Sequence, residues 1–154
     1  MFDFRYRLVQ FQIQRKLNIL KRTLRYIGSN VNIKPDLNVR NPSFISIGDD
    51  VAIDDGAKLF VWDSYKRANQ CFQPSLTIES GTHISRNLTI QCAGTLLIGK
   101  NALIASNVFI TDFNHGCNPS QDCYINQPLL VKNVTISDNV WIGQNAIILP
   151  GVNI

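Results

Sequence analysis

The sequence predicts an all-β fold, a triangular parallel β-helix of hexapeptide repeats that is preceded by an N-terminal α-helix. Apolar residues recur every three or four positions through the first 26 residues, and an aliphatic residue then recurs every six positions as far as Ile154. With 154 residues, 45% hydrophobic and 17% charged, the chain suits one compact domain and is too apolar to be disordered. We therefore predict a helix over residues 1–26 and a β-helical domain over residues 27–154.

The first 26 residues have the pattern of a basic amphipathic helix. An apolar stripe at the spacing of one helix face is formed by Phe2, Tyr6, Val9, Ile13, Leu17, Leu20, Leu24 and Ile27. No proline interrupts the segment, and Gly28 provides a stop. Seven Lys or Arg against one acidic residue give this segment a charge of +6, whereas eight Lys or Arg against ten acidic residues give the rest of the chain −2.

Two roles for this helix are open from the sequence. Its stripe can cap the first coil at Ile27 and Val31, because the open end of a β-helix exposes apolar side chains and unpaired strand edges. An apolar stripe opposite many basic residues is also typical of a helix lying on an anionic membrane surface. No stretch long enough to span a membrane lacks charge, and nothing near Met1 resembles a signal peptide. We therefore expect a cytoplasmic location, at the inner face of the membrane if the second role holds.

From Ile27 onward a period of six replaces the helical period. The series is aliphatic at every position: Ile27, Ile33, Val39, Ile47, Ile53, Leu59, Ile78, Ile84, Ile90, Ile98, Ile104, Ile110, Ile136, Ile142, Ile148 and Ile154. Three strands and three corners per turn make a triangular coil, and stacked coils bury the aliphatic side chains in ladders. Three positions after the aliphatic residue, where a tight corner needs positive φ, stand Asn30, Asp36, Asp50, Gly56, Gly81, Asn87, Asn101, Asn107, Asn139 and Asn145.

Two insertions interrupt the stack, one over residues 60–77 and the other over residues 111–135. Both leave at the third corner of a coil, and loops that leave a rigid scaffold are where functional residues concentrate. The four Cys residues have no CxxC spacing, so the sequence predicts neither a disulfide framework nor a zinc site. The mildly acidic body also lacks the basic, aromatic surface that binds nucleic acid.

The second insertion carries the most specific motif. Thr111-Asp-Phe-Asn-His115-Gly116, followed by Asn139-Val-Trp-Ile-Gly143, resembles the hexapeptide-repeat acyltransferases, in particular the sugar and polysaccharide O-acetyltransferases of the galactoside and maltose acetyltransferase type. The resemblance covers about residues 27–154. It implies a left-handed β-helix, a homotrimer with active sites between subunits, and acetyl-CoA as the acyl donor, with no metal. Members of the family continue past the position of Ile154 into segments that contact coenzyme A, so we expect this chain to lack those contacts.

His115 is the candidate general base, because acyl transfer to a hydroxyl needs a group that removes its proton near neutral pH. Its position matches the catalytic histidine of the family. Asp112 is the nearest acid and the candidate partner that fixes the tautomer of His115, a task that a backbone carbonyl can also perform. The other histidine, His83, precedes the inward Ile84 and is expected on the outer face of the stack.

The resemblance also implies residues that contact the two substrates. Ser85, Asn87 and Asn114 are the candidate substrate-binding residues, although Ser85 stands where galactoside enzymes carry an Asn and Asn87 also suits a structural corner. Contacts to acetyl-CoA are expected from Trp141, Gly143 and Gln144, where Trp141 also suits packing between coils or subunits. Ala93 replaces a carboxylate at a further sugar contact, which indicates an acceptor other than a simple galactoside.

The sequence thus predicts an acetyl-CoA-dependent O-acetyltransferase that acts on a saccharide, either a surface polysaccharide or its precursor. Two alternatives stay open: an N-acetyltransferase of nucleotide-linked amino sugars, and a non-catalytic β-helical structural or interaction protein. The zinc carbonic anhydrases that share this scaffold need three histidine ligands. They are excluded, because the chain has two histidines whose placing does not match that site.

Overall fold

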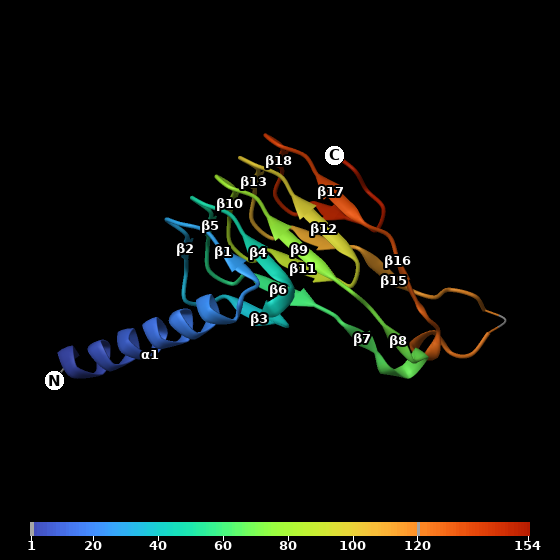
Figure 1. Cartoon of the computed structure of the whole chain (residues 1–154), viewed down its shortest axis with the longest axis horizontal. Coiled ribbons are helices and arrows are strands. Elements are labelled where there is room, and N and C mark those ends of the chain that lie inside the picture. The colour runs from blue at the N-terminus through green and yellow to red at the C-terminus, as the bar shows by residue number, and fades with distance from the viewer. Residues whose placement is uncertain (1, 120) are drawn as a thin grey trace.

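The computed structural model describes residues 2–119 and 121–154, and leaves the side chains of residues 2–6, 13 and 16 undescribed. The predicted contacts of Phe2, Tyr6 and Ile13 therefore lie outside the described residues. The chain forms one α-helix followed by a stack of triangular coils, from which two hairpins project on the side away from the helix (Figure 1).

Each coil contributes one strand to each of three parallel sheets, which we call the first, second and third faces. The first face contains β1 (Tyr26–Ile27), β4 (Ile45–Ile47), β9 (Ser75–Ile78), β12 (Thr95–Ile98) and β17 (Val134–Ile136). The second contains β2 (Asn32–Ile33), β5 (Ala52–Ile53), β10 (His83–Ile84), β13 (Leu103–Ile104) and β18 (Trp141–Ile142). The third contains β3 (Asn38–Arg40), β6 (Lys58–Val61), β11 (Thr89–Cys92), β14 (Phe109–Thr111) and β19 (Ile147–Ile148).

The aliphatic ladder has the register that the period of six predicts. On the second face Ile33, Ile53, Ile84, Ile104 and Ile142 pair in succession from coil to coil. Most members of the series are buried, and Ile47, Ile78, Ile84, Ile90, Ile98, Ile104, Ile110 and Ile136 are fully enclosed. Ile27 and Val39 in the first coil are partly buried, and Ile154 is 42% exposed. The stack is therefore held by an aliphatic core that runs along its axis.

The corners have the predicted backbone conformation at every position except Asp36. Positive φ occurs at Asn30, Asp50, Gly56, Gly81, Asn87, Asn101, Asn107, Asn139 and Asn145. Pro35 precedes Asp36, and proline at this place is compatible with a turn whose next residue keeps a negative φ. Amide side chains connect neighbouring corners, as between Asn87 Nδ2 and Asn107 Oδ1 at 3.0 Å.

The helix α1 (Phe2–Thr23) is joined to the stack by its C-terminal end alone. Leu17, Leu20 and Leu24 pack against the core, whereas Val9, in the same stripe, is 50% exposed on the part that projects away (Figure 1). Arg25 then donates to Ser43 O and Ser75 Oγ. The last turns of the helix therefore cover the first coil. Within the described residues, no helix combines the length and apolarity that crossing a membrane requires.

The two predicted insertions form paired hairpins at the third corner. The first contains β7 (Ser64–Tyr65), the 3₁₀ helix η2 (Lys66–Ala68) and β8 (Gln70–Cys71). The second contains β15 (Phe113–His115), η3 (Tyr124–Asn126) and β16 (Leu129–Val131). A third 3₁₀ helix, η1 (Pro42–Phe44), lies next to α1. The two hairpins run side by side and touch through η2 and η3 (Figure 1).

Candidate active site

His115 ends strand β15 and lies opposite Leu129 in the antiparallel β15–β16 ladder. Thr111, at the root of this hairpin, donates its hydroxyl to Phe113 O at 3.0 Å, and Gly116 N donates to Pro128 O at 3.0 Å just beyond the histidine. The backbone on both sides of His115 is thus fixed, while its side chain is exposed. Among the described residues, no side chain forms a hydrogen bond or ion pair with the imidazole.

Asp112 is turned toward the coil below rather than toward His115. It is fully buried, and its Oδ1 and Oδ2 accept the N–H groups of Ala93 at 2.7 Å and Gly94 at 2.8 Å. Burial raises the pKa of Asp112, against the opposing effect of these two N–H donors. Burial, together with the nearby Asp112 carboxylate, raises the pKa of the Cys92 thiol as well. Asp112 therefore stabilises the root of the β15–β16 hairpin through these two hydrogen bonds.

Gln127 organises the loop that follows His115, and sequence reasoning missed it. Its side chain is 3% exposed, its Nε2 donates to Asn118 O at 2.9 Å and Asp122 O at 2.7 Å, and its Oε1 accepts from Asn118 N. A Cβ on Gly116 would lie 2.7 Å from Gln127 Cβ, so the glycine is needed where the backbone passes this amide. The loop is therefore closed around one buried amide side chain.

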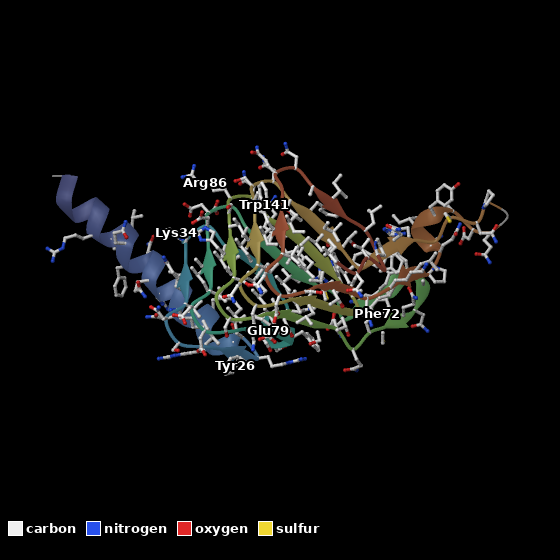
Figure 2. All side chains as sticks on the ribbon, turned by 90° about the horizontal axis from the view of Figure 1, so that it is seen from above. Tyr26, Lys34, Phe72, Glu79, Arg86 and Trp141 are labelled. Atoms are coloured by element: carbon white, nitrogen blue, oxygen red, sulfur yellow. The ribbon has the colours of Figure 1, made fainter. Side chains whose placement is uncertain are left out.

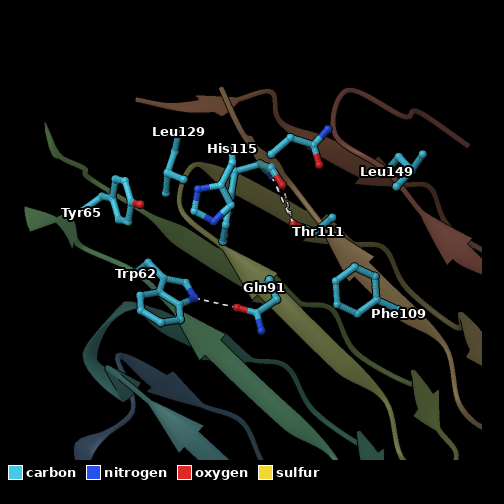
Figure 3. Close-up of a pocket in the computed structure, with 10 residues that line it drawn as sticks. Trp62, Tyr65, Gln91, Phe109, Thr111, His115, Leu129 and Leu149 are labelled. Carbon is cyan, nitrogen blue, oxygen red and sulfur yellow. Dashed lines mark hydrogen bonds between the residues drawn. The ribbon is translucent and has the colours of Figure 1, made fainter. Parts of the chain in front are cut away.

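The imidazole of His115 lies between two hollows in the surface. A cavity of about 400 Å³ has Trp62, Tyr65, Phe109 and Phe113 as aromatic lining, with Gln91, Thr111, Asn114, Leu129 and Leu149 completing it (Figure 3). A second hollow, of about 490 Å³, is lined by Gly116, Cys117, Tyr124, Ile125 and His115. His115 is the residue that both share, and the predicted Asn114 lines the first.

The far wall of the first cavity is built around Trp62, which the sequence did not identify as a site residue. Its Nε1 donates to Gln91 Oε1 at 2.7 Å (Figure 3). The Arg40 guanidinium lies 3.8 Å from its ring centre. Trp62 is thus held by a hydrogen bond and a cation–π contact. Trp62 stands three positions after the aliphatic Leu59, where the corner residues named above are Asn, Asp or Gly, and this departure is a signal that could have identified it.

The other predicted site residues lie on the second face and its edge, apart from both hollows. Trp141 belongs to β18, is 74% exposed and stands on the outside of the stack, on the same side as Lys34 and Arg86 (Figure 2). Gly143 and Gln144 follow it and are exposed, and nothing lies within 4 Å of a Cβ built on Gly143.

Ser85 and Asn87 lie on the same face, two coils below Trp141. Ser85 donates its backbone N–H to Ile104 O, and Asn87 occupies a corner with positive φ, from which its amide reaches Asn107. His83 points outward, as expected, and lies 3.7 Å from Asp54. Within one chain the structure therefore brings Asn114 to His115, but not Ser85, Asn87, Trp141, Gly143 or Gln144. Within residues 2–119 and 121–154, no group of three metal-ligating side chains is close enough to hold a metal ion.

The chain is similar in sequence to known acetyltransferases over part of its length. No family model matches the chain. WbbJ of Escherichia coli K12, provisionally assigned as a lipopolysaccharide biosynthesis O-acetyl transferase, is 31% identical over 120 residues, which cover 73% of this chain and 57% of WbbJ. The galactoside O-acetyltransferase of the same organism is 38% identical over 81 residues, which cover 49% of this chain and 39% of that enzyme. The chain thus spans little more than half the length of WbbJ.

A solved structure extends the comparison over nearly the whole chain. AntD, an N-acyltransferase from Bacillus cereus solved with dTDP and 3-hydroxybutyryl-CoA, superposes with a TM-score of 0.69 at 26% identity. The match covers 92% of this chain and 70% of AntD. The predicted fold class, a left-handed parallel β-helix with an N-terminal α-helix, is confirmed.

Proposed function

The chain belongs to the hexapeptide-repeat, left-handed β-helical acyltransferases, and from that premise we propose that it transfers an acetyl group from acetyl-CoA to a hydroxyl of a saccharide, with His115 as the general base. The observation that carries the proposal is the position of His115, whose exposed imidazole is shared by two hollows on a backbone fixed at both ends. Two reactants that approach from these hollows would meet at one base.

The proposed reaction needs one proton acceptor and no change of oxidation state. His115 removes the proton of the acceptor hydroxyl while its oxygen attacks the thioester carbonyl carbon. The tetrahedral intermediate then collapses, the carbon–sulfur bond breaks, and the proton held by the imidazolium passes to the coenzyme A thiolate. The products are the acetyl ester and free coenzyme A, and His115 returns to its neutral form.

The 400 Å³ cavity suits a saccharide acceptor. Four aromatic rings line it, and such rings pack against the C–H faces of a sugar, whereas Gln91, Thr111 and Asn114 supply polar groups for its hydroxyls. Trp62 is already fixed by Gln91 and Arg40, so no side-chain entropy is lost in ordering it when the acceptor binds.

The acyl donor is proposed to bind between subunits of a homotrimer. Trp141, Gly143 and Gln144 lie exposed on the second face, away from the His115 hairpin of their own chain. In a threefold assembly the second face of one subunit would stand opposite the hairpin of its neighbour. Ser85 and Asn87, on the same face, would then reach the substrate from the neighbouring subunit.

A second candidate is N-acylation of a nucleotide-linked amino sugar on the same scaffold. It is favoured by the likeness to AntD, whose match covers more of this chain than the matches to the O-acetyltransferases do. The acceptor of this candidate is an amine rather than a hydroxyl, so the acceptor distinguishes the two reactions. A non-catalytic β-helix is the remaining alternative.

Turnover with paired acceptors tests the proposal. Acetyl-CoA is incubated with saccharides and with amino sugars linked to nucleotides, and coenzyme A release is followed by chromatography, because the exposed thiols of Cys71, Cys117 and Cys123 would react with thiol reagents. We expect ester formation, and a loss of about 10²–10⁴-fold in His115→Ala. The control is His83→Ala, which removes the outward histidine. Amide formation alone would select the second candidate, and no transfer to either acceptor would select the non-catalytic alternative.

A further inference from the structure

The first insertion contributes two side chains that reach the His115 hairpin. Residues 60–77 form the β7–β8 hairpin, which lies along β15–β16 and touches it through η2 and η3 (Figure 1). Gln70 and Tyr65 extend from this hairpin to the strand opposite His115 and to the imidazole itself. Neither residue was singled out by the sequence.

Gln70 binds the backbone of the residue that pairs with His115. Its Nε2 donates to Leu129 O at 3.2 Å, and its Oε1 accepts from Leu129 N at 2.7 Å. One amide therefore satisfies both backbone groups of Leu129, as a further strand would. Because Leu129 is directly opposite His115 in the ladder and is 6% exposed, a shift of this strand would carry the histidine with it.

Tyr65 meets the imidazole of His115 edge to face. The two ring centres lie 5.5 Å apart at an interplanar angle of 74°, an arrangement that aromatic pairs favour (Figure 3). The Tyr65 hydroxyl donates to Ile125 O in η3, so both ends of the tyrosine are held by the second insertion. The imidazole has no hydrogen bond to another side chain in the described part of the chain, which leaves this ring contact to define its orientation.

We propose that Gln70 and Tyr65 are positioning residues for His115: Gln70 fixes the strand opposite it, and Tyr65 fixes the plane of its ring between the two hollows. The catalytic part of this inference rests on the proposed function of His115 as a base. The geometric part does not, since it concerns the orientation of the imidazole in the free protein. A base displaced by about 1 Å can lose about 10²-fold in rate, so such supports have a measurable effect.

The geometric part can be read directly by NMR, because the chain has only two histidines. The imidazole C–H signals of His115 and His83 are assigned with a His83→Asn variant. We expect the Tyr65 ring current to displace the His115 signal, so that Tyr65→Leu moves it toward the shift of an unstructured histidine. Tyr65→Phe keeps the ring and should keep most of the displacement. Gln70→Met, of similar length without the amide, should shift or broaden the same signal.

The catalytic part is read from steady-state kinetics on the same full-length variants. Tyr65→Leu and Gln70→Met should lower kcat by about 10²-fold, because they displace the base. In Gln70→Met, KM for both substrates should stay within about threefold, because Gln70 lines neither hollow. Tyr65→Leu also removes a ring that lines the proposed acceptor cavity, so KM for the acceptor should rise in that variant. Gln70→Glu keeps the acceptor for Leu129 N and should fall between Gln70→Met and the original chain. The matched control is Gln73→Ala, an exposed glutamine of the same insertion with no partner among the described residues.

The possible results separate this inference from the proposed function. An unchanged His115 signal in both Tyr65→Leu and Gln70→Met would overturn the positioning role, and so would an unchanged kcat in both. If Gln70→Met lowers the unfolding midpoint below the assay temperature, Tyr65→Leu and Tyr65→Phe decide the matter. A displaced signal in variants of a chain that transfers no acetyl group would overturn the proposed function and leave the geometric part intact.

Discussion

Asp112 is bound to Gly94, 18 positions earlier in the chain, through a hydrogen bond of 2.8 Å from the backbone N–H to Oδ2. Its other oxygen accepts the N–H of Ala93. The backbone N–H of Asp112 donates to Gln91 O in the same coil, and its carbonyl accepts from Lys132 N at the far root of the hairpin. A single residue therefore joins both roots of the β15–β16 hairpin to the coil below.

Asp112→Asn should destabilise the protein by about 1–3 kcal/mol, because an amide supplies one acceptor oxygen where two buried N–H groups need partners. Urea unfolding measures the effect. Asp36→Asn, at an exposed corner, is the matched control and should stay within about 0.5 kcal/mol of the original chain. Equal stability of the two variants would mean that the Asp112 carboxylate does not secure the hairpin.

The difference in free energy of unfolding between the original chain and Asp112→Asn should depend on pH. Burial raises the pKa of Asp112, so the folded chain holds this proton to a higher pH than the unfolded chain does. The free energy of unfolding attributable to Asp112 therefore falls as the pH rises from about 3.9 through the raised value. The stability advantage of the original chain over Asp112→Asn should be largest below this window. An advantage that grows with pH across the window contradicts the assignment.

Hydrogen bonds lower the pKa values of Asp49 and Asp122. These two residues therefore change the free energy of unfolding with pH in the direction opposite to Asp112. The stability that they contribute is present above their unfolded-state pKa and is lost as the pH falls through the lowered values. Both groups titrate in both proteins, so their effect cancels in the difference.

Ile104 tests the register of the ladder. It is fully buried between Ile84 and Ile142, so Ile104→Ala should cost about 2–5 kcal/mol through lost contacts and the cavity left behind. Lys100→Ala, an exposed change in the same coil, should cost less than about 0.5 kcal/mol. The register would be wrong if chemical unfolding gave the two variants similar stabilities.

Gly48 and Gly143 each follow an inward isoleucine but have different surroundings. A Cβ on Gly48 would lie 2.6 Å from Ser80 N, whereas a Cβ on Gly143 meets nothing within 4 Å. Gly48→Ala should therefore lower the free energy of unfolding by about 1–3 kcal/mol, because its Cβ would clash with the backbone of Ser80 in the next coil. Gly143→Ala should leave the free energy of unfolding nearly unchanged. Thermal unfolding of both variants checks this difference, and a larger loss in Gly143→Ala would reverse the interpretation.

The projecting part of α1 is expected to bind anionic membranes. Leu8 and Phe11 are 48% and 66% exposed, and the basic Arg7 lies exposed on the same part of the helix. Removal of residues 2–14 should abolish sedimentation with anionic vesicles at low salt and leave the unfolding midpoint unchanged, because Leu17, Leu20 and Leu24 remain on the core. Leu20→Ala, the control, should destabilise the fold and keep vesicle binding. Binding that persists after the deletion, or that is absent from the full chain, rules out a membrane role.

The coil register was predictable because each position of the repeat has one physical requirement. An inward position needs an aliphatic side chain, and a corner needs a residue that accepts positive φ, so the sequence repeats these choices visibly. His115 is a candidate base for a different reason, since its motif resembles that of a known family. Asp36 departed from the corner rule, and Pro35 alone does not explain this, because proline suits turns with either sign of φ at the next residue.

The supports of the site were not predictable in the same way. Gln70 and Leu129 are 59 positions apart, and both lie in insertions that have no period to fix their register. Asp112 is the acid nearest to His115 in sequence, yet alternation along the hairpin root turns it toward Ala93 and Gly94. Asp112 and His115 are close in sequence but are not in contact. Gln70 and Leu129 are in contact but are too far apart in sequence for their pairing to be predicted.

The placing of both insertions at one corner bears on how the protein folds. Equivalent positions of uninterrupted neighbouring coils are 20 residues apart, as between Ser29 and Asp49, whereas the interrupted junctions span 31 and 38 residues. The entropy of closing a loop rises only logarithmically, at about 0.6 kcal/mol for each doubling of length. The two insertions therefore add less than about 1 kcal/mol each to the free energy of loop closure between neighbouring coils. Folding can propagate from coil to coil past these insertions, so segments at the third corner are free to change in length during evolution while the stack keeps its cooperativity.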